Sequence, residues 1–325
     1  MPVISSSYSG PPRYLYNGHL QTVVPSMFRK VPGVAYERER LTLSDGDFID
    51  IDWLEQRPTT NTPRKLVILT HGLEGDSGRH YIKGTAKLFA QHGYDVLAWN
   101  CRSCSGEMNK AFRLYNHGEI GDIGELIRHA LRTKAYEKVV MVGYSMGGNI
   151  TLKYLGVHGR EAPEVIRGAV AISSPCDLMA SAKLLDQPAN KLYRNRFMKK
   201  LLTKIQQKAD LFPGKLDMQK VADVVLWRDF DNFFSAPLNG YRDADDFYEQ
   251  ASAINFMPGI TRPVLVLNAQ NDPILSPECA ATDLARAHPM IFAETPRTGG
   301  HVGFLAYRDP HTYAERRALA FLERE

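Results

Sequence analysis

The chain has 325 residues, of which 44% are hydrophobic and 23% charged, so it is long enough to bury a sizeable core. Its 40 basic and 36 acidic residues give a formal net charge of +4, and so small a surplus is not typical of a protein that binds nucleic acid. The sequence holds no apolar run long enough to form an integral membrane segment, and residues 1–18 lack the pattern of a signal peptide. Four cysteines are too few for a disulfide framework, so we expect a cytoplasmic protein.

Strand-like and helix-like stretches alternate along most of the chain. Residues 1–36 show no clear periodicity, and we expect them to wrap around the core. From residue 37, apolar and polar residues alternate on both sides of a turn at 44–47, which predicts an antiparallel hairpin. The later predicted strands lie at 65–70, 94–99, 138–143, 168–173, 263–268 and 290–294. The middle ones are apolar throughout and are joined by helix-like stretches such as 118–135, which predicts a mostly parallel, doubly wound α/β sheet.

One long interval interrupts this alternation. About ninety residues separate the strands predicted at 168–173 and 263–268. Part of the interval is amphipathic and basic, and we expect one face of a helix there to carry Leu192, Phe197, Leu201 and Ile205. Its basic residues are expected to face solvent rather than a membrane. We therefore expect a helical cap insertion at 176–254, an α/β core at 37–175 and 255–325, and a wrapping segment at 1–36.

A candidate nucleophile stands between a predicted strand and a predicted helix. Gly143, Ser145 and Gly147 form the pattern G-x-S-x-G at this junction. The pattern alone occurs by chance in roughly one chain in ten of this length, so its strand–turn–helix setting carries the argument. Glycine lets the backbone pass through the tight turn and leaves Ser145 exposed at the carboxyl edge of the sheet. The sequence therefore predicts Ser145 as the nucleophile.

A serine hydroxyl needs a base, and the base needs an orienting acid. In a fold with this motif, the acid and then the histidine follow on loops after later strands. Three histidines come late enough in the chain, namely His288, His301 and His311. His301 is favoured because it stands in a glycine-rich loop just after the last strand, whereas His288 precedes that strand and His311 begins the final helix.

The acid and the oxyanion hole are predicted from the ends of other strands. Asp272 follows the strand at 263–268 and is favoured as the acid, and Asp177 after the preceding strand is the alternative. Asn271 is either a helper or a turn residue. The oxyanion would be stabilised by the backbone N–H groups of Met146 and Leu73. His71, at a strand end, is expected to have a structural role.

These residues together resemble the α/β-hydrolase superfamily, and nearly the whole chain resembles its YheT-like branch. That branch comprises bacterial relatives of the plant embryogenesis-associated and animal abhydrolase-domain esterases. The stretches that carry the resemblance are NGHLQT (17–22), HGLEGDSGRHYI (71–82), NCRSCSG (100–106), GYSMGGN (143–149), RDFDNFFSAPLNGYRDADDFY (228–248), NAQNDP (268–273) and GGHVGF (299–304). The resemblance implies a serine carboxylesterase with Ser145, Asp272 and His301 as its catalytic triad. Ser103 departs from the family, which commonly has glycine there.

No cofactor is expected, because a serine triad needs neither a metal nor an organic group. Cys101 and Cys104 form a C-x-x-C pair, but zinc would need further ligands and the sequence has no second pair, so we expect packed thiols. Aromatic residues in and after the cap either line an acyl pocket or belong to the core: Trp227, Phe230, Phe233, Phe234 and Phe304.

The expected reaction is hydrolysis of a small carboxylic ester, with a short- to medium-chain acyl group, through an acyl-enzyme. A thioesterase or an acyltransferase could use the same triad. A non-catalytic ligand-binding protein of this fold is a less favoured alternative, because it would be expected to lack a triad member. The sequence carries no signal for an oligomeric state.

Overall fold

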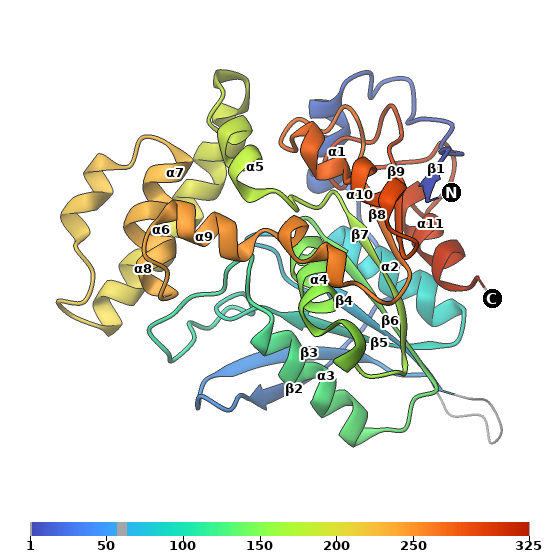
Figure 1. The fold of residues 1–325 in the computed structure, drawn as a ribbon, viewed down its shortest axis with the longest axis horizontal. Coiled ribbons are helices and arrows are strands. Elements are labelled where there is room, and N and C mark those ends of the chain that lie inside the picture. Colours follow the sequence, from blue (N-terminus) through green and yellow to red (C-terminus); the bar gives the residue numbers. More distant parts are fainter. Residues whose placement is uncertain (1, 57–63, 325) are drawn as a thin grey trace.

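A central sheet organises the protein, and the computed structural model describes residues 2–56 and 64–324. In this part of the chain, nine strands form one sheet in the order β1-β9-β8-β7-β6-β4-β5-β3-β2 (Figure 1). Their bounds are β1 Val3–Ile4, β2 Glu37–Thr42, β3 Phe48–Leu54, β4 Lys65–Thr70, β5 Tyr94–Asn100, β6 Lys138–Tyr144, β7 Ile166–Ile172, β8 Val264–Leu267 and β9 Ile291–Glu294. The strands expected from the sequence are confirmed, and β1 is an addition that the sequence did not suggest.

The strands from β4 to β9 run parallel, and the β2–β3 hairpin joins β5 in antiparallel pairing. The parallel strands are buried on both faces, as their continuous apolar runs predicted. Because parallel strands all end at the same edge, the loops that follow β4, β6, β8 and β9 come together there. This edge carries the candidate site.

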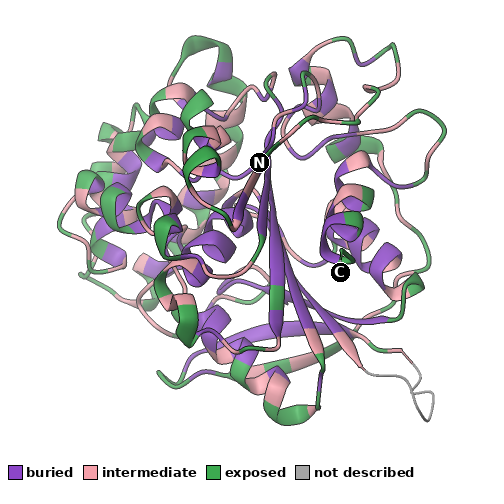
Figure 2. Cartoon of the chain, turned by 45° about the vertical axis from the view of Figure 1, so that its right-hand side comes forward, coloured by how far each residue is buried: buried purple, intermediate pink, exposed green. Residues whose placement is uncertain are grey.

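Helices cover both faces of the sheet, so the mostly parallel α/β fold is confirmed (Figure 2). On one face, α2 (His80–Gln91) and α11 (Tyr313–Leu322) pack with the sheet in one hydrophobic cluster. On the other face, α3 (Gly121–Thr133), α4 (Met146–His158) and α10 (Thr282–Ala287) form a second cluster. In the described residues, no helix is both long and apolar enough to span a membrane.

The chain between β7 and β8 forms a separate group of helices at one side of the sheet (Figure 1). They are α5 Leu178–Leu185, α6 Lys191–Leu211, α7 Trp227–Phe230, α8 Ala236–Leu238 and α9 Ala244–Ala251. These helices enclose a hydrophobic cluster of their own. We refer to this helical group as the cap, and its boundaries at residues 176 and 254 stay a prediction.

Helix α6 corrects one expectation about the cap. Leu201 and Ile205 are buried, with 7% and 0% of their surface exposed, but Leu192 is 83% exposed. At 100° per residue, the nine residues from Leu192 to Leu201 place the two side chains on opposite sides of the helix. The expectation that Leu192 shares the buried face was therefore wrong.

The first residues of the chain contain a helix that the sequence pattern did not reveal. Helix α1 spans Gly18–Phe28, and Asn17 caps it by accepting a hydrogen bond from Leu20 N at 2.8 Å. Its buried residues are Gly18, Gln21 and Pro25, so the helix has no apolar stripe to produce a periodic signal.

Arg29, directly after α1, anchors this helix to the rest of the fold. Its guanidinium donates to both carboxylate oxygens of Glu315 on α11, at 2.6 and 2.9 Å. The Glu315 side chain is completely buried and that of Arg29 is 9% exposed. A bidentate pair of this kind is strong, and either partner left alone would be a buried uncompensated charge.

We predict that Arg29→Ala destabilises the protein by at least about 3 kcal/mol, because Glu315 stays buried without its cation. The free energy of unfolding, measured by urea denaturation, checks this value. Lys30→Ala, at the exposed neighbouring position, serves as the control and is expected to leave stability unchanged. A loss below about 1 kcal/mol for Arg29→Ala would mean that the pair does not anchor α1.

The cap also buries a carboxyl group, that of Asp231. The hydroxyl of Tyr248 donates to Asp231 Oδ2 at 2.8 Å. Burial raises the pKa of Asp231 to about 6 from its ordinary value of 3.8. Between these two pH values, the folded chain holds a proton that the unfolded chain has released, so stability falls as the pH rises.

We predict that Asp231→Asn removes this pH dependence. The variant is expected to gain stability relative to the wild type between pH 4 and pH 7, by about 3 kcal/mol in total for a shift of about two pKa units. Urea denaturation of both proteins across this range measures the difference. Asp283→Asn is the matched control, because that carboxylate is 94% exposed. A gap between wild type and Asp231→Asn that stays constant with pH would contradict the prediction.

Candidate active site

Ser145 stands on a sharp turn between β6 and α4. Its φ of 53° and ψ of −122° lie outside the regions that a serine ordinarily adopts. The turn requires glycine on both sides, because a Cβ on Gly143 would lie 2.2 Å from the carbonyl oxygen of Gly147. A Cβ on Gly147 would in turn lie 2.3 Å from Thr70 O at the end of β4. The close approach that the G-x-S-x-G pattern predicted is confirmed, and it holds the serine at the edge of the sheet.

The structure brings Ser145, His301 and Asp272 into one hydrogen-bonded chain. His301 Nε2 lies 2.9 Å from Ser145 Oγ, and His301 Nδ1 lies 2.8 Å from Asp272 Oδ2. The side chains of His301 and Asp272 are 10% and 1% exposed. With Nδ1–H donating to the carboxylate, Nε2 is free to accept the proton of the serine hydroxyl. This arrangement is suited to activating a serine for nucleophilic attack.

The rival residues named from the sequence have other partners. Asp177 caps α5 by accepting a hydrogen bond from Ala180 N at 3.0 Å. His311 contacts Glu315 through Nδ1 at 3.3 Å, and His288 Nδ1 accepts from Met290 N at 3.2 Å. The geometry therefore favours Asp272 and His301 as the partners of Ser145.

Side chains from α1 hold the loop that carries His301. Thr22 Oγ1 accepts a hydrogen bond from the backbone N–H of His301 at 2.8 Å, and Gln21 Oε1 accepts from Gly299 N at 2.8 Å. Asn271 joins this arrangement, since it donates to Gln21 Oε1 at 2.9 Å and accepts from Gly300 N at 3.0 Å. Asn271 is thus a positioning residue.

Sequence reasoning had no role for Gln21 and Thr22. Both lie in the NGHLQT stretch, which contributes to the family resemblance. An uncharged polar pair in an apparently aperiodic segment gives no physical signal of its own, because its partners are almost 280 residues away.

The loop after β4 passes directly beside the serine. A Cβ on Gly72 would lie only 3.0 Å from Ser145 Cβ, so the next residue, Leu73, begins close to the nucleophile. Met146 is the first residue of α4, where a backbone N–H has no acceptor within the helix. The positions of Leu73 and Met146 are therefore compatible with the predicted oxyanion hole, which stays a prediction.

His71 fixes the shape of this loop. Its Nε2 accepts a hydrogen bond from Cys101 N at 3.0 Å, so its Nδ1 carries the proton and donates to Gly72 O at 2.7 Å. Burial lowers the pKa of His71 to about 4, which keeps the ring neutral. These contacts support the structural role expected for His71.

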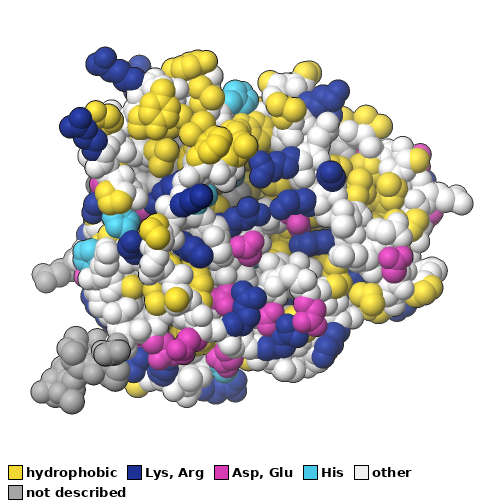
Figure 3. Space-filling view, turned by 180° about the vertical axis from the view of Figure 1, so that it is seen from behind, with side chains coloured by type: hydrophobic (Ala, Val, Ile, Leu, Met, Phe, Trp, Pro, Cys, Tyr) yellow, Lys and Arg dark blue, Asp and Glu magenta, His cyan; other side chains and the backbone are white. Residues whose placement is uncertain are grey.

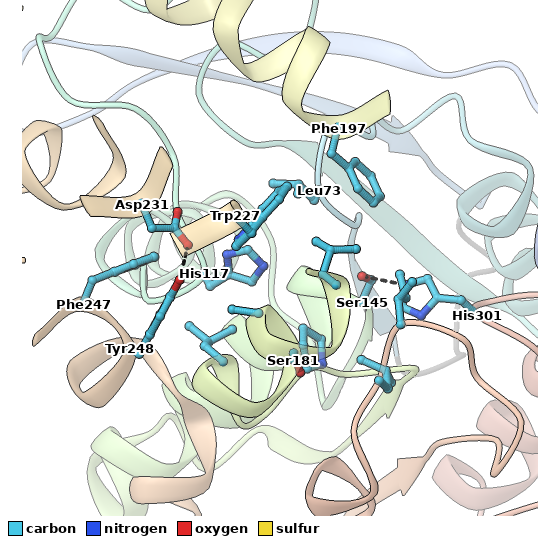
Figure 4. A pocket seen from close by; sticks show the side chains of 16 residues that line it. Leu73, His117, Ser145, Ser181, Phe197, Trp227, Asp231, Phe247, Tyr248 and His301 are labelled. Carbon is cyan, nitrogen blue, oxygen red and sulfur yellow. Dashed lines mark hydrogen bonds between the residues drawn. The ribbon is translucent and has the colours of Figure 1, made fainter. Parts of the chain in front are cut away.

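Two adjoining cavities are both lined by Ser145 and His301, and we describe them as two arms of the site. The first arm, which we call the cap arm, lies under the cap and is mostly apolar (Figure 4). Its apolar lining includes Leu178, Ala182, Leu185, Phe197, Trp227 and Phe247. Across the arm from Ser145 lies the Asp231–Tyr248 hydrogen bond, as Figure 4 shows. An acyl chain bound in this arm would leave water and contact aliphatic and aromatic groups.

The aromatic residues considered from the sequence separate into two groups. Trp227 lines the cap arm, whereas Phe230 and Phe234 are buried in the hydrophobic cluster of the cap and Phe233 packs against it. Phe304 belongs to the hydrophobic cluster on the face of the sheet that α2 and α11 cover. Of these five aromatic side chains, Trp227 is the one placed to contact a substrate.

The second arm, which we call the mouth arm, lies between α1, the loop after β4 and α6. Thr22, Val23 and Ser26 line it from α1, and Arg196 and Lys200 line it from α6. It is more polar than the cap arm, so the two sides of the serine offer different surroundings to the two halves of a substrate.

No metal-binding constellation is evident at this site. Across residues 2–56 and 64–324, no group of three or more His, Cys, Asp or Glu side chains is arranged to hold a metal ion. Cys101 is a buried free thiol, and the partly buried Cys104 thiol contacts Lys204. Ser103 has a φ of 62°, a left-handed conformation that glycine adopts more readily.

Comparison with known proteins identifies the family of the chain. Residues 65–306 match the family model described as alpha/beta hydrolase fold. The chain is 31% identical to the putative esterase YheT of Escherichia coli over 303 residues, which cover 93% of this chain and 88% of that protein. It is 28% identical to phospholipase ABHD3 of Homo sapiens over 329 residues, or 99% and 80% of the two chains.

The esterase Pf2001 of Pyrococcus furiosus, a solved structure, shares the fold with a TM-score of 0.54 at 17% identity, covering 91% of this chain and 90% of that one. The family model spans most of the chain, and the similarity to YheT extends over nearly all of it. The chain therefore belongs to the α/β-hydrolase superfamily, in the branch that includes YheT and ABHD3.

Proposed function

We propose that the protein is a serine carboxylesterase that hydrolyses carboxylic esters with short- to medium-chain acyl groups. The observation that carries this proposal is the hydrogen-bonded chain from Ser145 through His301 to Asp272, which opens into an apolar arm. Its similarity to proteins named as a putative esterase and a phospholipase supports ester chemistry. The Ser145, His301 and Asp272 side chains would form the catalytic triad.

In the acylation step, His301 Nε2 takes the proton of Ser145 as Oγ attacks the ester carbonyl carbon. The negative charge that develops on the carbonyl oxygen would be stabilised by the N–H groups of Met146 and Leu73. His301 then returns the proton to the leaving alcohol, and the acyl group stays bound to Ser145 Oγ. Asp272 holds the imidazole in the required tautomer and stabilises its positive charge throughout.

In the deacylation step, His301 takes a proton from water, whose oxygen attacks the acyl carbon. The second tetrahedral intermediate collapses when Ser145 Oγ leaves and regains a proton from His301, which releases the carboxylic acid. A thioester could replace the ester in the acylation step. An alcohol could replace water in the deacylation step. Thioester hydrolysis and acyl transfer therefore remain the alternatives to be compared in the assays.

The cap arm supports the choice of acyl length. Its apolar lining would stabilise a bound chain by about 0.8 kcal/mol for each CH₂ removed from water. The polar pair of Asp231 and Tyr248 lies among the residues that line it. A CH₂ group that displaced or covered these polar groups would add less binding free energy than one in contact with the apolar lining. The arm is therefore best suited to chains that end before this pair.

We predict that Ser145→Ala and His301→Ala each lower kcat for p-nitrophenyl butyrate by about 10⁶-fold, and that Asp272→Asn lowers it by about 10⁴-fold. The wild type, but not Ser145→Ala, is expected to be labelled by a fluorophosphonate, which reacts with an activated serine. Asp177→Asn, a change at the rival acid, is the matched control and is expected to keep most of the activity. If Ser145→Ala retained ordinary esterase activity, the assignment of the nucleophile would be wrong.

We predict a maximum in kcat/KM across p-nitrophenyl esters from acetate to palmitate. The value should rise up to roughly fourfold per added carbon while the chain fills the cap arm, and then fall. Ala182→Leu, which narrows the arm, should move the maximum to shorter chains, whereas Met179→Leu, at an exposed position of the same helix, should not. Equal activity on butyrate and palmitate, or no shift with Ala182→Leu, would contradict the role of this arm.

Parallel assays with butyryl thioesters and with added alcohols separate the three reaction types.

A further inference from the structure

Three positively charged side chains line the mouth arm beside the nucleophile. They are Arg79, from the loop after β4, and Arg196 and Lys200, from α6. Among the described residues that line this arm, one carboxylate, that of Glu74, opposes them. In the view of Figure 3, Lys and Arg side chains gather around a hollow near the middle of the molecule.

Two of these cations are held close together by one backbone oxygen. Arg79 Nη2 donates to Glu74 O at 2.7 Å, and Lys200 Nζ donates to the same oxygen at 3.3 Å. Glu74 is itself fixed, because its backbone N–H and its carboxylate both contact the Tyr115 hydroxyl, at 3.0 and 2.5 Å. The two cations are thus placed by a rigid part of the fold.

The Glu74 carboxylate is engaged by a different cation. Lys204 Nζ lies 2.7 Å from Glu74 Oε1, and both side chains are largely buried. Asp76 approaches Arg79 only to 3.8 Å, with both side chains partly exposed, so this contact neutralises little of the charge. Three cations against one carboxylate leave a surplus of two positive charges in the mouth arm, even before Lys204 is counted.

Such a surplus is unfavourable without an anion. Arg79 and Lys200 are partly buried and donate to the same oxygen, so their like charges repel with less screening by water than charges on an open surface. Burial lowers the pKa of Lys200, and the neighbouring charge of Arg79 lowers it further. Glu74 opposes this shift, and Arg196 and Lys204 add to it. A bound oxyanion would relieve this repulsion through charge-assisted hydrogen bonds.

The mouth arm and the cap arm share Leu73, Phe197 and Ile274 around Ser145 and His301. If the apolar cap arm takes the acyl chain, the alcohol half of the ester extends into the cationic mouth arm. We infer that the preferred substrates carry a phosphate group on the alcohol half, bound by Arg79, Arg196 and Lys200. A phosphate monoester has nearly two negative charges at neutral pH, which matches the surplus of the arm. This inference rests on the proposed esterase function.

The test compares two esters that differ in one group, 1-hexanoylglycerol 3-phosphate and 1-hexanoylglycerol. The measured quantity is the ratio of kcat/KM for the phosphate ester to kcat/KM for the neutral ester. Both reactions are assayed by the release of hexanoic acid. A general defect in folding or in the triad lowers both values and leaves the ratio unchanged. We expect a wild-type ratio of about 10 or more, and a lower ratio when NaCl is added.

Variants on α6 assign the preference to the cluster. Arg196→Gln and Lys200→Gln should each lower the ratio by about five- to tenfold, since each removes one charge-assisted contact. Lys199→Gln is the matched control, because Lys199 is an exposed residue of the same helix outside the cavity lining, and it should leave the ratio unchanged. A wild-type ratio near one, or a ratio that Lys199→Gln lowers as much as Lys200→Gln, would overturn the inference.

A further pair of esters tests which half of the substrate the cations contact. Monomethyl adipate carries a negative charge on its acyl half, and methyl hexanoate is its neutral counterpart. A preference for monomethyl adipate that depends on Arg196 and Lys200, without a preference for the phosphate ester, would overturn the assignment to the alcohol half.

Binding without turnover separates this inference from the proposed function. Calorimetry on Ser145→Ala should detect glycerol 3-phosphate binding, and the additional change Lys200→Gln should weaken that binding about five- to tenfold. If the wild type cleaves none of the esters but glycerol 3-phosphate binds in this way, the proposed function fails and the phosphate site stands. If the esters are cleaved and glycerol 3-phosphate does not bind, the phosphate site fails alone.

Discussion

The site depends on one close approach, that of the first turn of α4 to the ends of β4 and β6. Gly147 lies so near Thr70 O and Gly143 that no side chain fits between them. The backbone must therefore turn sharply at Ser145, which accounts for its unusual φ and ψ angles. Both strands lie inside the sheet and are buried except at their first residues, so the strained residue is held by the interior of the fold.

The remaining parts of the site are arranged around this fixed point by segments that are far apart in the sequence. The end of β8 supplies Asp272, the loop after β9 supplies His301, and the loop after β4 brings Gly72 against the serine. The cap arm and the mouth arm then give the two sides of the serine opposite character, one apolar and one cationic. A single sheet edge thus places the Ser145–His301–Asp272 chain between two surroundings of different polarity.

The parts that could be predicted from the sequence are those with local signals. Continuous apolar runs predicted the parallel strands, and the glycines around Ser145 predicted the turn, because both patterns reflect contacts close in the chain. The order of residues favoured Asp272 over Asp177 but did not exclude the latter, which proved to be a helix cap.

The parts that escaped prediction depend on distant or polar contacts. Helix α1 gave no periodic signal because its buried residues, Gly18, Gln21 and Pro25, are not a hydrophobic stripe. The apolar character of Leu192 predicts a buried position, but its angle around α6 directs the side chain away from the buried face. The cationic mouth arm draws on two separate elements, and no single stretch of sequence contains it.

The hydrogen bonds that the backbone N–H groups of Gly299 and His301 donate to Gln21 and Thr22 join residues 278 and 279 positions apart. Contacts between such distant segments slow folding, because the loop-closure entropy must be lost before the contacts stabilise the fold. While the polypeptide is still being synthesised on a ribosome, residue 145 is made well before residue 301. During that time, α1 has no His301 loop to contact. In the proposed mechanism, the nascent chain is therefore inactive until residue 301 has been made and its loop has met α1.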